Sequence, residues 1–207
     1  MSHQLKRTLR RFLAILTLSC SLVPTLYAEP DTEKAIFAGG CFWCMEPPFD
    51  ALDGVISTTS GYTGGTVVKP TYKQVSSGTT GHTEALQVIF NPEKITYEEL
   101  LETFWINIDP VDDGGQFCDR GSQYRSEVFY TNDRQHELAE KSKQQLDASG
   151  LLPAPVKTAI TAASEFYPAE DYHQNYYQKN PKRYKFYSWN CGRKQRLLLL
   201  WGKAYND

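Results

Sequence analysis

The chain has 207 residues, a length that suits one globular domain behind a short leader and leaves no room for a large multidomain protein. Its 22 basic and 24 acidic residues give a formal net charge of −2, which argues against a nucleic-acid binder, because such affinity rests on clustered Lys and Arg. The five cysteines are unevenly spaced, unlike those of a disulfide-stabilised scaffold. We therefore interpret them as reactive thiols rather than as structural disulfides.

The first 28 residues are typical of a secretory signal peptide. A basic stretch from Lys6 to Arg11 contains no acid, and the apolar run 12–23 follows it. That run is shorter than the roughly 20 apolar residues that a membrane span needs. We expect cleavage after Ala28 and an exported, periplasmic domain of residues 29–207, with an uncleaved membrane anchor and a lipoprotein as the alternatives.

Residues 34–38 predict a buried strand that runs through a Gly-Gly pair into a helical turn at Cys41. Such a turn brings the Cys41 sulfur near backbone N–H groups, and these groups and the helix dipole favour the thiolate, the nucleophilic form of cysteine. Cys44 lies three residues further on, on the same face if the turn is helical. Pro47-Pro48 lacks two backbone donors, so an unbroken helix from Cys41 is not expected.

Strand and helix signals alternate irregularly along the remaining chain. We predict strands at 55–60, 84–90, 127–131 and 157–163. We predict helices at 96–109, 133–149 and 169–179. Thr96 caps the first of these helices, and Gly150 stops the second. Helices interspersed with strands of mixed direction indicate an α+β fold built as a two-layer sandwich.

Short motifs follow one another along the domain: Gly40-Cys41-Phe42-Trp43, Gly61-Tyr62-Thr63-Gly64-Gly65, Pro70-Thr71-Tyr72, Gly81-His82-Thr83-Glu84, Gly115-Gln116-Phe117, Asp119-Arg120-Gly121-Ser122-Gln123-Tyr124-Arg125, Tyr172-His173-Gln174 and Lys179-Asn180-Pro181. In these motifs and their order, the chain resembles the A-type peptide methionine sulfoxide reductases over about residues 34 to 202. The resemblance implies a ferredoxin-like core with a mixed sheet and a long, partly irregular C-terminal segment. It also implies thiol-dependent reduction of the S-epimer of methionine sulfoxide, free or in proteins, as a repair of oxidative damage.

Cys41 is the expected nucleophile, and a buried structural thiol is the plainer alternative. A sulfoxide is a poor electrophile until its oxygen is protonated, so the site needs an acid that stays protonated near neutral pH. Glu84 fits, because it starts a strand that can point it inward, and partial burial raises the pKa of a carboxyl. The resemblance implies that Glu84 is the catalytic acid and that Tyr72 and Tyr124 donate hydrogen bonds to the sulfoxide oxygen.

Three further residues are expected to bind substrate. The resemblance implies that Phe42 and Trp43 enclose the ε-methyl group and that Asp119 helps to hold the substrate and its water. Core packing is the alternative for the two aromatic residues, and a turn is the alternative for Asp119. An apolar cage would explain how the two sulfoxide epimers are distinguished, because methyl and oxygen need different surroundings. Neither a bound cofactor nor a metal is expected.

After methionine leaves, Cys41 would be a sulfenic acid, with which a second thiol condenses. Cys191 lies beside a glycine that permits movement, and relatives of this type commonly resolve with a cysteine in a mobile C-terminal tail. We therefore predict a Cys41–Cys191 disulfide, with Cys44 as the main alternative and Cys118 as the third. The resemblance implies an external thioredoxin-type reductant or another dithiol that reduces this bond.

Two other classes of protein use paired cysteines. A thioredoxin-like disulfide oxidoreductase has a Cys-x-x-Cys pair after a strand, but it would not explain the Gly-His-Thr-Glu or Gln-Tyr-Arg motifs. A zinc module with four cysteine ligands would need a second close pair in the sequence, which Cys118 and Cys191 do not form. The reductase is therefore our prediction.

Overall fold

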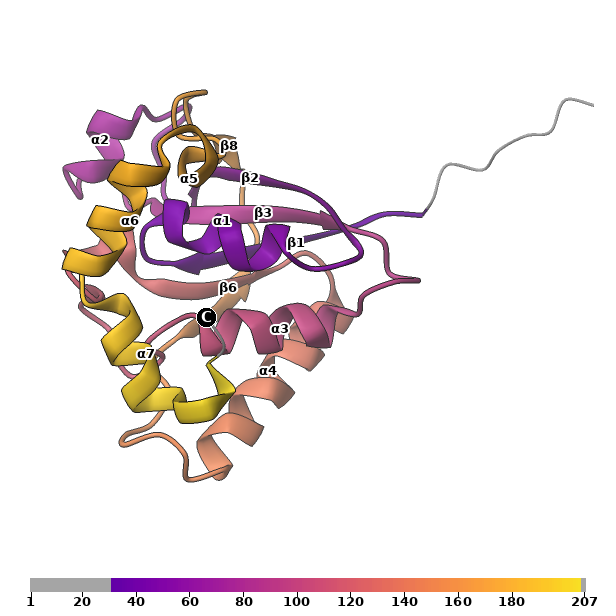
Figure 1. Ribbon diagram of the computed structural model, residues 1–207. Coiled ribbons are helices and arrows are strands. Elements are labelled where there is room, and N and C mark those ends of the chain that lie inside the picture. The colour runs from indigo at the N-terminus through magenta and orange to yellow at the C-terminus, as the bar shows by residue number, and fades with distance from the viewer. Residues whose placement is uncertain (1–30, 206–207) are drawn as a thin grey trace, which may run out of the picture.

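A mixed six-stranded sheet forms the centre of the computed structural model, which describes residues 31–205 (Figure 1). The predicted signal peptide lies outside the described residues. The strand order is β7-β6-β1-β3-β2-β8, and all neighbours are antiparallel except β6 and β7. The strands are β1 (Glu33–Gly39), β2 (Val55–Thr63), β3 (Thr83–Phe90), β6 (Ser126–Tyr130), β7 (Ala159–Ala162) and β8 (Tyr167–Pro168). A separate hairpin pairs β4 (Gly115–Gln116) with β5 (Asp119–Arg120).

The longer helices of the first two-thirds of the domain pack on one face of the sheet. They are α1 (Phe42–Asp50), α3 (Tyr97–Ile106) and α4 (Asp133–Ala148). The short helix α2 (Tyr72–Ser76) and the 3₁₀ turn η1 (Ser122–Tyr124) lie in connections. In Figure 1, α3 and α4 lie side by side below the sheet, while the C-terminal helices run down the left side. This arrangement confirms the predicted α+β class with a mixed sheet.

The apolar run in β1 is buried on both faces, because a separate hydrophobic cluster covers each face of the sheet there. On the helical face, Phe37 stacks with Phe49 and Phe104 at ring distances of 5.3 and 5.2 Å. On the other face, Ile36 packs in a smaller cluster that includes Phe129. Both faces of this central strand therefore exclude water, and its C-terminal end is held rigidly where Cys41 follows.

Helix α1 is continuous through Pro47 and Pro48, so the prediction of a broken or distorted turn is wrong. The two prolines remove N–H donors but do not end the helix. Met45 and Phe49 of the same helix are almost fully buried against the core. Tertiary packing of an apolar face can outweigh lost helical hydrogen bonds, because most of the stability of a helix in a protein comes from such packing.

The predicted helix 169–179 forms only in its last turn, α5 (Tyr176–Lys179). The side chain of Gln174 explains the difference, because its amide accepts from the Ser60 N–H at 2.9 Å and donates to the Ser60 carbonyl at 2.8 Å. Gln174 thus pairs with the edge of β2 as a strand would. A side-chain contact across 114 residues competes here with local helix propensity.

The segment after Asn180 is helical, although an irregular tail was predicted. It forms α6 (Pro181–Asn190) and α7 (Arg193–Trp201), followed by the 3₁₀ turn η2 (Gly202–Ala204). Pro181 occupies the first helical position, where its missing N–H costs nothing. Gly192, with φ of +70°, separates α6 from α7.

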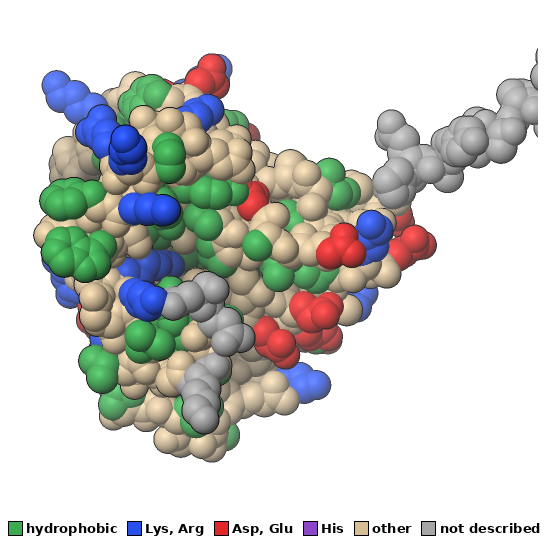
Figure 2. Space-filling view, in the orientation of Figure 1, with side chains coloured by type: hydrophobic (Ala, Val, Ile, Leu, Met, Phe, Trp, Pro, Cys, Tyr) green, Lys and Arg blue, Asp and Glu red, His purple; other side chains and the backbone are tan. Residues whose placement is uncertain are grey.

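Exposed apolar side chains gather over these C-terminal helices, at the left edge of Figure 2. Phe186 and Trp189 of α6 are 67% and 68% exposed, and Leu199 of α7 is 80% exposed. No helix among residues 31–205 is both long and apolar enough to cross a membrane.

Candidate active site

Cys41 occupies the N-cap position of α1, two residues after the end of β1 at Gly39. The two glycines before it permit a close approach of neighbouring segments. A Cβ atom on Gly39 would lie 2.5 Å from the Met45 sulfur, and one on Gly40 would lie 2.5 Å from the Gln116 Cβ. Gly40 also has a φ of +81°, which residues with a side chain rarely adopt. The Gly-Gly pair therefore lets the strand turn sharply into the helix and places the Cys41 side chain in the interior.

Glu84 lies beside this turn because β3 is the neighbour of β1 in the sheet. Its carboxylate accepts a hydrogen bond of 3.1 Å from the backbone N–H of Phe42, the first residue of α1. The side chain is buried, and burial raises the pKa of Glu84 to about 8, although the Phe42 N–H acts in the opposite direction. Glu84 is therefore a protonated acid near neutral pH, which agrees with the pKa direction expected from its sequence context.

The thiols of Cys41 and Cys44 are free, buried and hydrogen-bonded to each other. Burial and the Cys44 sulfur raise the pKa of Cys41. The pKa of Cys44 is lowered, first by its hydrogen bond with Cys41 and then by the nearby Arg193 guanidinium, against the effect of burial. The pKa of Cys41 is thus raised, contrary to the expectation that the helix N-terminus favours its thiolate, because burial and the neighbouring Cys44 act against the charged form. The Phe42 N–H, the first of the helix, bonds to Glu84 instead.

A cavity of about 70 Å³ brings all the predicted catalytic and substrate-binding residues together. Its lining consists of Cys41, Phe42, Trp43, Tyr72, Glu84, Asp119, Tyr124 and Tyr187. These residues come from the β1–α1 turn, β3, α2, β5, η1 and α6. Cys41 and Tyr187 thus line the same cavity although they are 146 positions apart in the sequence.

Two phenol groups in this cavity keep their protons at neutral pH. Burial, followed by the charge of Glu84, raises the pKa of Tyr72 to about 12 and raises that of Tyr124 further. Both hydroxyl groups are therefore hydrogen-bond donors in the pH range where Glu84 is itself an acid.

The indole of Trp43 is held in place by two contacts. Its Nε1–H donates to Nδ1 of His173 at 3.0 Å, and its ring stacks on Tyr176 with centroids 3.7 Å apart. Burial lowers the pKa of His173, so the imidazole is neutral at pH 7 and can accept this bond. His173 is therefore a structural partner of Trp43.

Comparison with known proteins identifies the family. A family model described as peptide methionine sulfoxide reductase matches residues 33–204. The chain is 54% identical over 170 residues to the peptide methionine sulfoxide reductase MsrA of Bacillus subtilis, which covers 82% of this chain and 96% of the relative. It is 51% identical over 175 residues to the MsrA of Bacillus licheniformis, with 84% and 97% covered. The chain belongs to the A-type peptide methionine sulfoxide reductases.

Solved structures support this family and its fold. The reduced form of Mxr1 from Saccharomyces cerevisiae matches the chain with a TM-score of 0.70 and 34% identity, covering 75% of this chain and 90% of that one. Methionine sulfoxide reductase A of Corynebacterium diphtheriae matches with a TM-score of 0.66 and 34% identity, covering 78% and 81%. The predicted family, its fold class and its enzyme class, peptide-methionine (S)-S-oxide reductase, are confirmed.

Tyr187 is the residue of this reductase's cavity that sequence reasoning missed. Its hydroxyl donates a short hydrogen bond to Oδ2 of Asp119, and its ring meets the edge of Trp43 at 5.8 Å. Burial raises the pKa of Asp119, against the effect of the Tyr187 hydrogen bond. Tyr187 lies four residues before Cys191, and residues four apart share one face of a helix. A prediction that the tail is helical would therefore have placed Tyr187 on the same side as Cys191.

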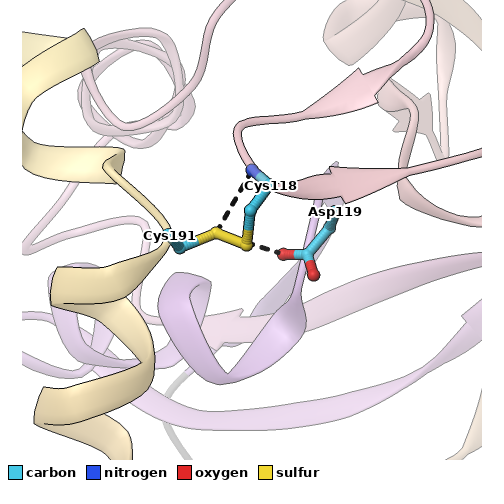
Figure 3. Close-up of side chains that lie close together, drawn as sticks. All are labelled: Cys118, Asp119 and Cys191. Carbon is cyan, nitrogen blue, oxygen red and sulfur yellow. Dashed lines mark hydrogen bonds between the residues drawn. A yellow bond between two sulfur atoms is a disulfide. The ribbon is translucent and has the colours of Figure 1, made fainter.

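A disulfide joins Cys118 to Cys191, which lie 73 residues apart in the sequence (Figure 3). The predicted Cys41–Cys191 pairing is therefore not the one in this structure, because the hairpin β4–β5 places Cys118 next to the end of α6. Asp119 lies beside the bond, and these three residues are close enough together to hold a metal ion. Bonded sulfurs are not thiolate ligands, so the oxidised pair offers no metal site.

Proposed function

We propose that this reductase converts the S-epimer of methionine sulfoxide, free or in a protein, to methionine, with Cys41 as the nucleophile. The observation that carries the proposal is the cavity in which the Cys41 thiol, the Glu84 carboxyl and two phenols meet. Sulfoxide reduction by a thiol needs a nucleophile, a proton for the oxygen and donors that stabilise the charge growing on that oxygen. The side chains of the cavity supply all three.

In the first step the Cys41 sulfur attacks the sulfoxide sulfur. Its proton passes to the Cys44 thiolate, the form that the lowered pKa of Cys44 favours, which leaves Cys44 as a thiol. Glu84 protonates the sulfoxide oxygen while Tyr72 and Tyr124 donate hydrogen bonds to it. The oxygen then moves from the substrate sulfur to the Cys41 sulfur: a Cys41 S–O bond forms while the substrate S–O bond and the bond between the two sulfurs break. Cys41 is left as a sulfenic acid, and methionine leaves. Glu84 then regains its proton from solvent.

Substrate orientation follows from the mixture of apolar and polar side chains in the cavity lining. Phe42 and Trp43 form an apolar wall beside Cys41, which suits the ε-methyl group. Glu84, Tyr72 and Tyr124 form the polar wall, which suits the oxygen. Exchange of methyl and oxygen would place the oxygen against the aromatic wall without a donor, which disfavours the R-epimer. Asp119 completes the lining and takes part in holding the substrate.

Cys44 is the thiol best placed to resolve the sulfenic acid. It is hydrogen-bonded to Cys41, whereas Cys191 is bonded to Cys118 in this structure. Condensation of the Cys41 sulfenic acid with the Cys44 thiol releases water and forms a disulfide. A dithiol reductant of the thioredoxin type supplies the two electrons that return the enzyme to its thiol form. Direct resolution by Cys191 is the alternative.

The test uses reduced enzyme in excess over each methionine sulfoxide epimer, without external reductant. The wild type should release methionine from the S-epimer and not from the R-epimer, and Cys41→Ser should release none. Cys44→Ser should release methionine more slowly and accumulate a sulfenic acid at Cys41, which dimedone labels. Methionine release by Cys41→Ser equal to that of the wild type would overturn the proposal.

We also propose that the reductase is exported and acts in the periplasm. The basic stretch and apolar run of the first 28 residues support this location. N-terminal sequencing of the protein isolated from the periplasmic fraction should find a chain that starts at Glu29. Recovery of the full-length chain from the membrane fraction would instead indicate an uncleaved anchor.

A further inference from the structure

We propose that Glu170 is a positioning residue of the reaction, which fixes the start of α2 against β2 and so places the Tyr72 hydroxyl for the sulfoxide oxygen. The inference rests on the proposed function, in which Tyr72 donates a hydrogen bond to that oxygen. Glu170 does not line the cavity, so it acts through Tyr72 rather than on the substrate. The sequence did not predict a role for it.

The helix that carries Tyr72 is short and little buried. It has five residues, and Val75 is its only buried side chain. It stands at the edge of the molecule, at the upper left of Figure 1. Isolated helices need roughly 12 to 15 residues to be even marginally stable, so a helix of this length depends on bonds from other segments. The place of the Tyr72 hydroxyl depends on the same bonds.

Glu170 supplies two such bonds at the N-terminal end of α2. One carboxylate oxygen accepts from the Tyr72 backbone N–H at 2.9 Å, and the other accepts from the Tyr62 hydroxyl at 2.9 Å. Tyr62 lies in β2, is fully buried and packs its ring against that of Phe42 in the cavity wall, with centroids 6.0 Å apart. Tyr62 therefore provides a fixed point, and Glu170 connects α2 to it.

The Glu170 carboxylate carries its charge at neutral pH. Partial burial acts to raise the pKa of Glu170, but the hydrogen bonds that it accepts lower the pKa overall. Hydrogen bonds to an ionised acceptor are shorter and stronger than those between neutral groups. Both bonds of Glu170 are therefore of the stronger kind, although the residue lies only partly out of solvent.

The turn that Glu170 begins also reaches Trp43, through the backbone rather than through the carboxylate. The His173 N–H donates to the Glu170 carbonyl at 2.8 Å. The His173 ring lies 4.4 Å from that of Tyr72 and accepts the Trp43 indole N–H. One turn of chain thus sets the Tyr72 hydroxyl, which suits the sulfoxide oxygen, relative to the Trp43 ring, which suits the methyl group. Truncation of the Glu170 side chain should release Tyr72 and leave Trp43 in place.

Single-turnover methionine release from saturating S-epimer by reduced enzyme tests this role. Glu170→Ala should be slower than wild type by about tenfold to 10²-fold, because a displacement near 1 Å can cost that much. The S-epimer concentration for half-maximal rate should change little, since Trp43 stays in place. Glu170→Gln should recover most of the rate, because its amide oxygen can accept the Tyr72 N–H and its amide N–H can donate to the Tyr62 oxygen. Asp171→Asn, which removes an exposed charge from the same turn, is the matched control and should equal wild type.

A double-mutant cycle separates positioning from a general structural role. Tyr72→Phe should itself slow release, and Glu170→Ala should add little to it, because no hydroxyl is left to place. If Glu170→Ala does not fold, Glu170→Asp takes its place in the cycle, since it shortens the side chain and keeps the charge.

Equal slowing by the Glu170 variant in both backgrounds would overturn the inference and leave the proposed function intact. A Glu170→Gln rate as low as that of Glu170→Ala would show that charge rather than the two bonds matters, which would also overturn it. A Tyr72→Phe rate equal to that of wild type would remove Tyr72 from the proposed mechanism and the inference with it.

Discussion

Glu84 combines two roles that depend on its surroundings. It is a buried carboxyl whose pKa is raised to about 8, and it also accepts the first N–H of α1. The same hydrogen bond that positions Glu84 removes that N–H group from Cys41. The Phe42 N–H therefore bonds to Glu84 rather than to the Cys41 sulfur, and burial keeps the Glu84 carboxyl protonated in spite of this bond.

Glu84→Gln should slow methionine release in a single turnover by about 10² to 10⁴-fold, the usual contribution of a general acid. The amide can still accept the Phe42 N–H but cannot supply a proton. Glu46→Gln is the matched control, since Glu46 is also buried but does not line the cavity. Rapid-quench kinetics measure the step, and a rate for Glu84→Gln within a factor of two of that of the control would contradict the acid role.

The raised pKa of Glu84 also predicts how stability depends on pH. The unfolded chain releases this proton near the ordinary glutamate pKa of about 4.3, whereas the folded chain holds it up to about 8. The contribution of Glu84 to the free energy of unfolding is therefore full below that lower pKa and is lost as the pH rises to about 8. Urea unfolding from pH 4 to 9 should show wild type losing a few kcal/mol relative to Glu84→Gln. A difference that is constant with pH would show that the carboxyl is not held protonated.

At the scale of single elements, α3 and α1 form for different reasons, the first through capping residues and the second through packing. In α3 the residues at the start of the helix cap each other: the Thr96 hydroxyl accepts from the Glu99 N–H at 3.2 Å, and the Glu99 carboxylate accepts from the Thr96 N–H at 2.8 Å. In α1, Pro47 and Pro48 disfavour a helix, and the buried contacts of the helix with the core stabilise it. Caps act between neighbours in sequence, whereas burial depends on the completed fold.

Thr96→Ala should lower the free energy of unfolding by about 1 kcal/mol, within the usual range of roughly 0.5–2 for loss of an N-cap. Thr96→Ser keeps the hydroxyl and should remain close to wild type. Equilibrium urea unfolding compares the three proteins. Equal losses in the two variants would show that the methyl group, rather than the cap, matters at this position.

At the scale of the whole molecule, the Cys118–Cys191 bond ties the C-terminal helices to the hairpin β4–β5. Arg196 of α7 adds a 2.6 Å ion pair with Asp109, and Arg193 donates to the Asn107 carbonyl. The C-terminal helices are thus held to the rest of the domain by a covalent bond and by polar contacts, while Phe186 and Trp189 remain exposed.

Reduction of this disulfide should lower the free energy of unfolding by up to about 4 kcal/mol, the value that chain entropy gives for a loop of this length. Urea unfolding of wild type with and without dithiothreitol measures the change. Cys118→Ser is the control, because it should show no effect of dithiothreitol. Equal stability of the oxidised and reduced wild type would show that the C-terminal helices are held by their non-covalent contacts alone.

The sequence by itself determined the local structure around the reaction site. The Gly-Gly-Cys turn, the strand that starts at Glu84 and the capped helix after Thr96 were predictable, because each depends on residues close in sequence. The resemblance then implied that Tyr72, Tyr124 and Asp119 belong to the same site, and the structure places all three in its cavity.

Only the tertiary structure decided which sulfurs pair and what covers the cavity. Spacing in the sequence carries no information about two cysteines 73 residues apart, because their separation depends on how the sheet and the hairpin place α6. Tyr187 and the helical tail were missed for the same reason. The contacts that hold α6 and α7 come from residues such as Asp109 and Asp119, which local patterns in the tail do not contain.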